Sequence, residues 1–160
     1  ERYHISWLYQ SRLAATKEFQ ALKLLYPVGV AVPEPIKHNR HAIVMGMIEG
    51  AELYRYRDIP EPKQVFMEIL ENVRKAYLEA GVIHADLSEY NVILQPDMRV
   101  LIIDWPQYVR SNHPNANELL GRDLRNILTF FRKKRLLNAS FNEVFDYVVG
   151  RRDSVRVTLV

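Results

Sequence analysis

The chain has 160 residues, of which 48% are hydrophobic and 26% charged, a composition ordinary for one globular domain or one large lobe. It contains no Cys, which excludes disulfides and thiolate metal sites, and no apolar run approaches the roughly 20 residues of a transmembrane helix. The formal net charge of +3 permits contact with nucleic acid without requiring it. Because the chain starts at Glu1, inside what the sequence predicts to be a helix, we expect it to be part of a longer protein.

The first third of the chain predicts one helix followed by a hairpin. Apolar residues recur at helical spacing over residues 7–26, and Pro27 then ends the helix. Residues 30–35 are punctuated by proline and are expected to be extended. Residues 36–45 predict two strands joined by a turn at Asn39-Arg40.

The remainder of the chain predicts helices around a pair of apolar strands. The expected elements are a short helix at 51–56, a long helix from Pro62 to Ala80 ended by Gly81, a strand before His84, strands at 92–94 and 100–103, and helices from Glu118 to Arg132 and over 141–149. The tail 151–160 is basic, and the sequence leaves its conformation open.

The most informative stretch is VIHADLSEYNVIL, residues 82–94. A strand leads into His84-x-Asp86, Asn91 follows five residues later, and a second apolar strand ends in Asp104. This order is typical of the catalytic and metal loops of protein-kinase-like phosphotransferases. Asp86 is the candidate that accepts a substrate hydroxyl proton, while Asn91 and Asp104 offer oxygen ligands to Mg²⁺ on ATP phosphates. We expect His84 to hold the loop backbone rather than to titrate.

Each of these pieces taken alone also has a purely structural explanation. A single His-x-Asp is common in loops, and an Asp that ends a strand is often a turn residue. The pieces occur here in order, on strands and directly after a long helix, which favours the phosphotransferase. The basic run Arg132–Arg135 stays open between two interpretations, contact with RNA phosphates and a solvated helix end that complements the helix dipole.

The residues of these motifs resemble those of one family. The segments HADLSEYN at 84–91 and IIDWPQ at 102–107 resemble the RIO family of atypical serine/threonine protein kinases. Further segments resemble its type-two branch, namely SWLY at 6–9, SRLAA at 11–15, NRHAIVM at 39–45, SNHPNA at 111–116 and RDLRNI at 122–127. The resemblance extends to about Arg152.

The resemblance implies an α+β fold, a protein-kinase-like two-lobed fold with a mostly helical C-terminal lobe and part of the N-terminal lobe. Residues 1–48 would then form the partial N-terminal lobe, 49–152 the C-terminal lobe and 153–160 a basic tail. The winged helix, the phosphate loop and the strand with the ATP-binding Lys are absent from this sequence. We therefore expect this piece alone to bind ATP poorly and to be inactive.

The resemblance also assigns roles to individual residues. Asp86 and Asp104 are the catalytic residues, and Asn91 and Asp104 are the Mg²⁺ ligands. The position of Asp104 is also thought to receive the phosphoryl group in this family. Residues expected to bind ATP are Glu18, which would pair with the absent Lys, Gly46, Met47 and Ile48 at the hinge beside adenine, and Ile93 and Ile103 below the nucleotide. Asp123 resembles a kinase Asp that binds the backbone of the catalytic loop.

Two departures from ordinary protein kinases lie within these motifs. Ser88 stands where those kinases carry a Lys, and Trp105-Pro106 replaces Phe-Gly, so that Pro106 restricts the backbone after Asp104. Gly46 stands where the type-two branch often has Glu.

The function implied by the resemblance is a kinase and ATPase that uses ATP and Mg²⁺ in maturation of the small ribosomal subunit. Its partner would be the pre-small-subunit ribosomal particle, with ribosomal RNA and assembly proteins. We expect a cytoplasmic protein that has no contact with membranes and is a monomer when free. The alternative is a non-catalytic docking module that binds RNA or protein through its basic C-terminal surface. A small-molecule kinase of the aminoglycoside or choline type shares His-x-Asp and Asn, but the Asp-Trp-Pro-Gln segment speaks against it.

Overall fold

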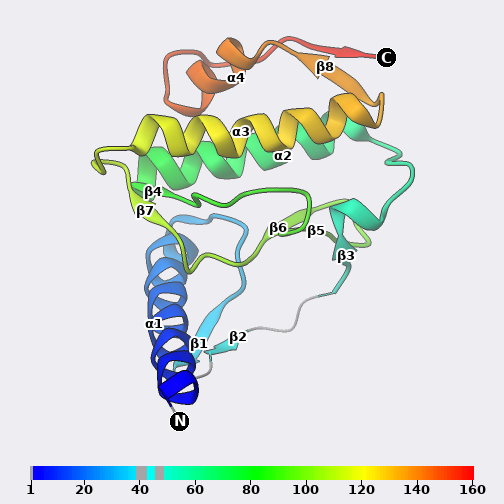
Figure 1. Cartoon of the computed structure of the whole chain (residues 1–160). Helices are drawn as coiled ribbons and strands as arrows, with labels where there is room; N and C mark the ends of the chain where they lie inside the picture. Colours follow the sequence, from blue (N-terminus) through cyan, green and yellow to red (C-terminus); the bar gives the residue numbers. More distant parts are fainter. Residues whose placement is uncertain (1, 39–42, 46–48) are drawn as a thin grey trace.

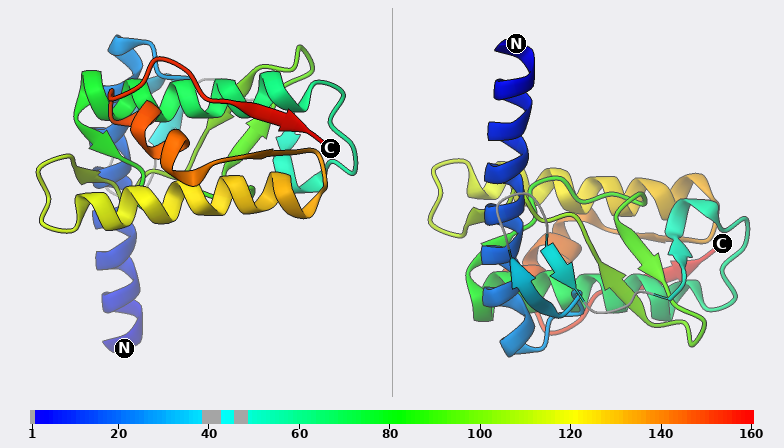
Figure 2. Two further views of the ribbon diagram at one scale, coloured as in Figure 1. Left: turned by 90° about the horizontal axis from the view of Figure 1, so that it is seen from above. Right: turned by 90° about the horizontal axis from the view of Figure 1, so that it is seen from below.

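The computed structural model describes residues 2–38, 43–45 and 49–160, and it begins with a helix that stands apart from the rest. Helix α1 (Arg2–Leu25) projects from the body of the molecule with the N-terminus at its far end (Figures 1 and 2). Its C-terminal part packs into the core through Ala21, Leu22 and Leu25. The 3₁₀ turn η1 (Tyr26–Val28) follows and contains Pro27, and Gly29 in the left-handed conformation ends it.

Two strands lie beside α1. Strand β1 (Pro35–His38) pairs antiparallel with β2 (Ile43–Met45), which confirms the two strands of the predicted hairpin. The register shifts between Pro35 and Lys37, which indicates a bulge near the start of β1. The predicted turn at Asn39-Arg40 lies outside the described residues.

The central sheet has the strand order β3–β5–β6 and is antiparallel throughout. Strands β5 (Val92–Leu94) and β6 (Val100–Ile102) form at the predicted positions, and the turn Gln95–Met98 joins them. The helix predicted at 51–56 is wrong in its first half. Ala51 and Glu52 instead form β3 and pair with Leu94 and Ile93, because the exposed edge of β5 offers backbone partners that a single helical turn lacks. Only η2 (Leu53–Arg55) is helical.

Two long helices cover this sheet and run side by side (Figure 1). Helix α2 (Pro62–Lys75) continues through the π-helical turn η3 (Ala76–Ala80) to Gly81, so the predicted helix is confirmed in extent. Helix α3 (Ala116–Lys133) begins two residues before the predicted start. Phe66 of α2 meets Phe131 of α3 edge to face at 5.2 Å between ring centroids, at the centre of the core.

Three further short strands, β7, β8 and β9, were not predicted from the sequence. Strand β4 (Val82–Ile83), which was expected, pairs with β7 (Val109–Arg110), and β8 (Leu137–Ala139) pairs with β9 (Val157–Leu159). Helix α4 (Phe141–Val148) lies between β8 and β9 in the chain, and Ser140 caps it by accepting the N–H of Glu143. The tail whose conformation the sequence left open therefore forms a strand on the outer side of α3 (Figure 1).

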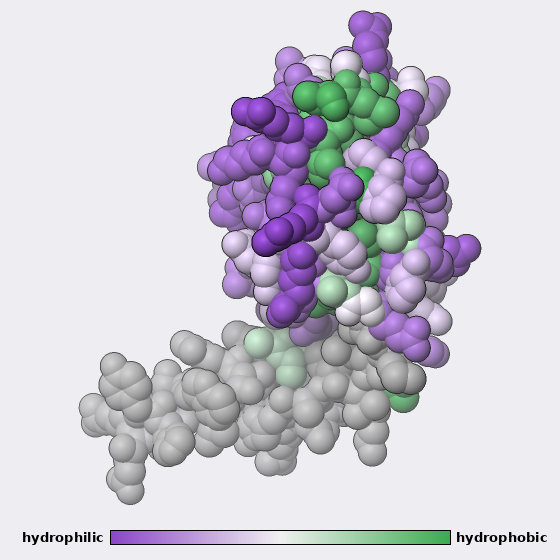
Figure 3. Space-filling view, turned by 90° about the vertical axis from the view of Figure 1, so that its right-hand side faces the viewer, coloured by the Kyte–Doolittle hydropathy of each residue, from purple (hydrophilic) through white to green (hydrophobic). Residues whose placement is uncertain are grey.

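One face of the molecule carries an apolar strip between polar borders. Figure 3 shows hydrophilic side chains on both sides of this strip over the described part of that face. Large apolar side chains that stay exposed include Leu159 and Val160 at the C-terminal end of the chain. The other apolar side chains of α2, α3 and the central sheet are mostly buried in one continuous core.

The junction before β3 depends on a glycine. Gly50 has φ +124°, and a Cβ at this position would overlap the carbonyl oxygen of Leu94. We expect Gly50→Ala to lower the free energy of unfolding by at least about 2 kcal/mol, because β3 must move away from β5. Urea denaturation of both proteins would measure this change.

Gly121 provides the matched control. It lies inside α3 with an ordinary helical backbone, and a Cβ added there would have Cζ of Phe141 as its nearest atom, at 3.6 Å. We expect Gly121→Ala to raise the free energy of unfolding by about 0.5–1 kcal/mol, since Ala loses less backbone entropy in a helix. Equal effects of the two substitutions would contradict the assigned role of Gly50.

Candidate active site

The β5–β6 pair brings two of the predicted site residues to one end of the central sheet. Val92 pairs with Ile102, and beyond this pair the N–H of Ile103 donates to the carbonyl oxygen of Asn91 at 3.0 Å. Asn91 and Asp104 therefore leave the two strands at the same end. Asp104 is exposed and has φ +62°, a left-handed conformation that Asp tolerates better than most residues.

The loop that carries Asp86 is held by side chains of α3. The carboxylate of Asp123 accepts the N–H groups of Ala85 at 2.8 Å and of Leu87 at 3.0 Å. Arg122 donates to the carbonyl oxygen of Ala85 at 2.5 Å. Asn126 donates to the carbonyl oxygen of Leu87 at 3.0 Å. Both neighbours of Asp86 thus have their N–H and C=O groups bound by one helix.

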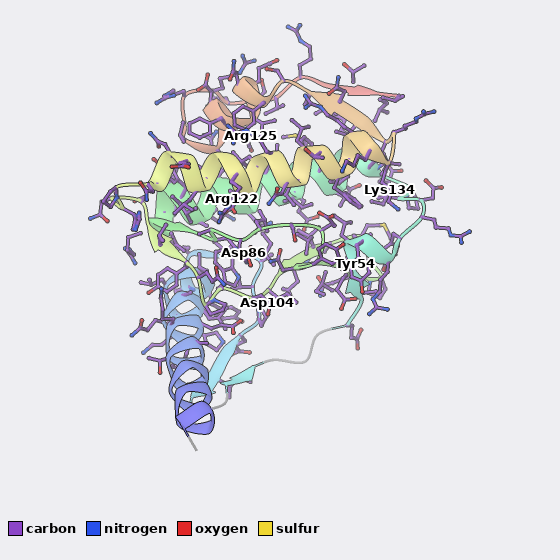
Figure 4. All side chains as sticks on the ribbon, in the orientation of Figure 1. Tyr54, Asp86, Asp104, Arg122, Arg125 and Lys134 are labelled. Atoms are coloured by element: carbon purple, nitrogen blue, oxygen red, sulfur yellow. The ribbon has the colours of Figure 1, made fainter. Side chains whose placement is uncertain are left out.

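This fixed backbone leaves Asp86 free to meet a substrate. Asp86 is exposed, whereas its neighbours Ala85 and Leu87 are buried. Ala85 has φ +70°, an uncommon conformation for a residue with a side chain, and the bonds from Asp123 and Arg122 hold it there. The loop is therefore preorganised around an exposed carboxylate. Figure 4 shows Asp86 and Asp104 on the same side of α3.

Asn91 is fixed by two hydrogen bonds within the same loop. Its Oδ1 accepts the N–H of Ser88 at 2.8 Å, and its Nδ2 donates to the carbonyl oxygen of Asp86 at 2.8 Å. The residue is 6% exposed. Because an amide oxygen has two lone pairs, Oδ1 keeps one for a cation. Because Asn91 is a candidate metal ligand, its bond to the backbone of Asp86 fixes the candidate base and the candidate ligand relative to each other.

His84 and Trp105 connect the catalytic loop to the end of β6. Nε2 of His84 donates to the carbonyl oxygen of Ile103 at 2.8 Å, and Nδ1 accepts the N–H of Asp86 at 3.2 Å, which requires a neutral ring. Burial lowers the pKa of His84, consistent with that tautomer. Trp105 is 1% exposed, donates to the carbonyl oxygen of Ile102 and packs against His84 with the ring centroids 4.6 Å apart and the ring planes tilted by 53°. His84 therefore has the expected structural role.

Glu18 reaches the same region from α1. Its Oε1 accepts the N–H of Trp105 at 3.5 Å, a long contact. Burial raises the pKa of Glu18, and the charge of Asp104 raises it further. Among the described side chains, those of residues 14–36 and 49–160, no ion pair involves Glu18. The structure thus places a partly buried carboxylate beside Asp104, where a cation would relieve the repulsion between them.

The residues present fit a magnesium ion bound with phosphates. Among the described residues no group of three or more His, Cys, Asp or Glu side chains could hold a metal by itself. One amide oxygen of Asn91 and one carboxylate of Asp104 suit Mg²⁺, which prefers oxygen ligands and keeps several waters or phosphate oxygens.

The predicted nucleotide contacts are placed only in part. Ile93 is buried in β5 and Ile103 is half-buried after β6. Gly46, Met47 and Ile48 lie outside the described residues. The roles of Ile93, Ile103 and the three hinge residues stay predictions.

Arg122 and Asn126 had no role predicted from the sequence. Both lie within one helical turn of Asp123, at positions i−1 and i+3 of α3. The position of Asn126 relative to Asp123 is a usable signal, because side chains three residues apart share a helix face. Sequence gives no comparable signal for Arg122, because adjacent residues of a helix do not normally share a face. Only the structure shows that Arg122 and Asp123 both contact the same loop.

Comparison with known proteins identifies the family. A family model described as RIO domain matches residues 1–144. The chain belongs to the RIO family. This confirms the resemblance stated from the motifs.

Several of the relatives found carry names of the type-two branch. The chain is 44% identical to the RIO-type serine/threonine-protein kinase Rio2 of Methanocaldococcus jannaschii, over 92% of this chain and 57% of the relative. It is 40% identical to the serine/threonine-protein kinase rio2 of Schizosaccharomyces pombe, over 80% of this chain and 37% of the relative. The chain therefore spans about half or less of the length of these relatives.

A solved structure supports the fold class. The Rio2 kinase of Chaetomium thermophilum, in a complex with ADP, Mg²⁺ and phosphoaspartate, superposes with a TM-score of 0.76 and 28% sequence identity. The match covers 92% of this chain and 51% of that one. The α+β, protein-kinase-like fold expected for this RIO domain is thereby confirmed. In the described part of the chain, no helix is long and apolar enough to cross a membrane.

The burial of Asp123 makes the stability of this RIO domain depend on pH. Burial raises the pKa of Asp123 to about 6, against the opposite effects of its two backbone N–H donors and of Arg122. Because this pKa is above its ordinary value, Asp123 contributes stability at low pH that is lost as the pH rises through about 6. We expect Asp123→Asn to cost about 1–3 kcal/mol at pH 7.5, since one amide oxygen cannot accept both N–H bonds. The cost should be about 1 kcal/mol larger at pH 5.

Urea denaturation at both pH values measures the two costs. Asp97→Asn, in the exposed turn between β5 and β6, is the control and should change stability equally at both. A cost of Asp123→Asn that is the same at pH 5, or smaller, contradicts the assignment.

Proposed function

We propose that the protein is a RIO-type serine/threonine protein kinase that uses Mg-ATP, with Asp86 as the catalytic base. The observation that carries the proposal is the backbone clamp on both sides of Asp86, made by Arg122, Asp123 and Asn126 of α3. A loop held in this way presents one exposed carboxylate at a fixed place, which phosphoryl transfer requires more than covalent chemistry. The names of the relatives support the same activity.

Each residue then has a definite task. Asp86 accepts the proton of the acceptor hydroxyl as its oxygen forms a bond to the γ-phosphorus and the bond to the β–γ bridging oxygen breaks, releasing ADP. Asn91 and Asp104 would hold Mg²⁺, which would neutralise phosphate charge. His84 links the two loops through its bond to the carbonyl oxygen of Ile103 and its contact with the ring of Trp105, which is itself held by the carbonyl oxygen of Ile102.

A second acceptor is proposed for the same centre. The Chaetomium thermophilum Rio2 structure contains a phosphoaspartate. In this chain the exposed Asp104 would receive the phosphoryl group, and hydrolysis of the acyl phosphate would then make the protein an ATPase. Its left-handed backbone turns the chain out of β6 immediately at this residue.

The cellular setting follows from the family resemblance. We place the protein in the cytoplasm, as a monomer when free, acting on the pre-small-subunit ribosomal particle with its ribosomal RNA and assembly proteins. Part of the basic run expected to dock on that particle is occupied, since Arg132 binds Asn138 and the carbonyl oxygen of Ala139. The catalytic proposal is therefore favoured over a pure docking module.

Labelling with γ-labelled ATP and Mg²⁺ tests the proposal on the full-length protein. We expect hydroxylamine-sensitive label on the wild type and none on Asp104→Ala, because an acyl phosphate needs that carboxylate. We expect Asp86→Ala to lower transfer to a Ser or Thr acceptor about 10²–10⁴-fold, the usual contribution of a general base. Asp97→Ala is the control and should label as the wild type does.

The remaining outcomes separate the alternatives. Acid-stable label that only Asp86→Ala abolishes indicates a Ser/Thr kinase without the acyl phosphate. Absence of both label and turnover contradicts the kinase and favours the docking module.

A further inference from the structure

A hollow opens directly beside the catalytic loop. It has a volume of about 600 Å³, and its walls come from the loop after Asp86, from η2 and from the C-terminal end of α3. We call it the tyrosine–lysine cleft, after Tyr54, Tyr90, Lys133 and Lys134 among its lining residues. Ser88, two residues after Asp86, also lines it. Figure 4 shows Tyr54 and Lys134 on the same side of Asp86.

Hydrogen bonds tie the three walls together. The N–H of Tyr54 donates to the carbonyl oxygen of Glu89 at 3.2 Å, which joins η2 to the catalytic loop. Asn126 of α3 donates to Leu87 in that loop, and Nζ of Lys134 donates to the carbonyl oxygen of Tyr56 at 3.3 Å. The cleft is therefore formed before any ligand arrives, which lowers the entropic cost of binding.

The surface of the cleft combines aromatic rings with positive charge. Tyr54 and Tyr90 are 38% and 62% exposed, and their ring centroids lie 4.8 Å apart. Exposed tyrosine pairs are typical of binding surfaces, because the rings bury large areas with few rotatable bonds. Lys133 and Lys134 are both exposed, and Glu89 is the one acidic residue that lines the described cleft. The charge balance favours an anionic ligand.

We propose that the tyrosine–lysine cleft binds the acceptor protein through acidic residues that flank its Ser or Thr. This inference rests on the proposed kinase activity and names its substrate class. The acceptor hydroxyl must reach Asp86, and the cleft begins on the same loop, so the chain next to the acceptor enters it. The stretch of α3 from Asn126 to Lys133 is about 10 Å long, which matches about three residues of extended peptide.

The position of the lysines sets the specificity. Lys133 and Lys134 lie at the far end of that stretch, one α3 turn or more beyond Asn126. Carboxylates a few residues from the acceptor would therefore meet the two ammonium groups, while the tyrosine rings pack on the intervening side chains. A nucleic-acid strand could also stack on tyrosines, but a Ser or Thr acceptor belongs to a polypeptide, which makes the polypeptide the favoured occupant.

Paired peptides test the proposal on the full-length protein. One peptide carries Glu at the positions two to five residues from a central Ser on both sides, and its partner carries Lys there. We expect the KM of the Glu peptide to be about tenfold lower, and the double substitution Lys133→Glu with Lys134→Glu to abolish or reverse this preference. Arg125→Glu with Arg151→Glu is the matched control, since both residues line a different hollow between α3 and α4. This control should keep the preference.

Two further measurements keep the outcomes separable. Fluorescence anisotropy of the labelled Glu peptide reports binding without any catalysis, and label on Asp104 reports the kinase centre without any peptide. Equal KM values and equal anisotropy for the two peptides overturn the cleft assignment, while label on Asp104 would leave the proposed function intact. Binding of a single-stranded oligonucleotide that the Lys133/Lys134 substitutions abolish, with no binding of either peptide, also overturns it and assigns the cleft to nucleic acid.

Discussion

The carboxylate of Asp123 accepts the backbone N–H groups on both sides of Asp86, and most of the candidate site depends on this pair of bonds. The acceptor is 1% exposed and belongs to α3, the helix that also packs against α2 at the centre of the core. The position of the catalytic loop is thus set by the main helical layer of the fold. Asn91 and His84 then transmit that position to the end of β6, through the loop backbone and the carbonyl oxygen of Ile103.

The long elements could be predicted because their signals are local. The helix from Pro62 to Gly81 has a proline that starts it, a glycine that ends it and an apolar face between them. The outer strands β7, β8 and β9 were not predicted. Strands β7 and β9 have two and three residues and no continuous apolar run next to a recognisable motif, and they exist because distant segments supply partners. The same cause explains the error at Ala51-Glu52, where pairing with β5 outweighs local preference.

In the candidate site, too, local patterns could be predicted and contacts between distant segments could not. Asp86, Asn91 and Asp104 stand at fixed distances from apolar strands, so their spacing alone indicates a phosphotransferase. The clamp by Arg122 and Asn126 joins residues 37 and 39 positions apart in the chain, and no sequence pattern within either segment reports it. The ring contact between Trp105 and His84 likewise requires the two loops to lie together. Sequence therefore predicts the candidate reactive groups, and structure shows which side chains orient them.

The turn Gln95–Met98 lies at the end of the β5–β6 hairpin opposite Asn91 and Asp104. An extra residue inside either strand would shift one of these side chains by about 3.3 Å along the sheet and direct it to the other face. An extra residue within the turn leaves the pairing from Leu94–Val100 onward unchanged. The lengths of strands β5 and β6 are thus fixed by the positions of Asn91 and Asp104, whereas the length of the turn can vary. We therefore expect differences in chain length among members of the family to fall in this turn. A spectroscopic label attached in this turn would likewise leave the site undisturbed.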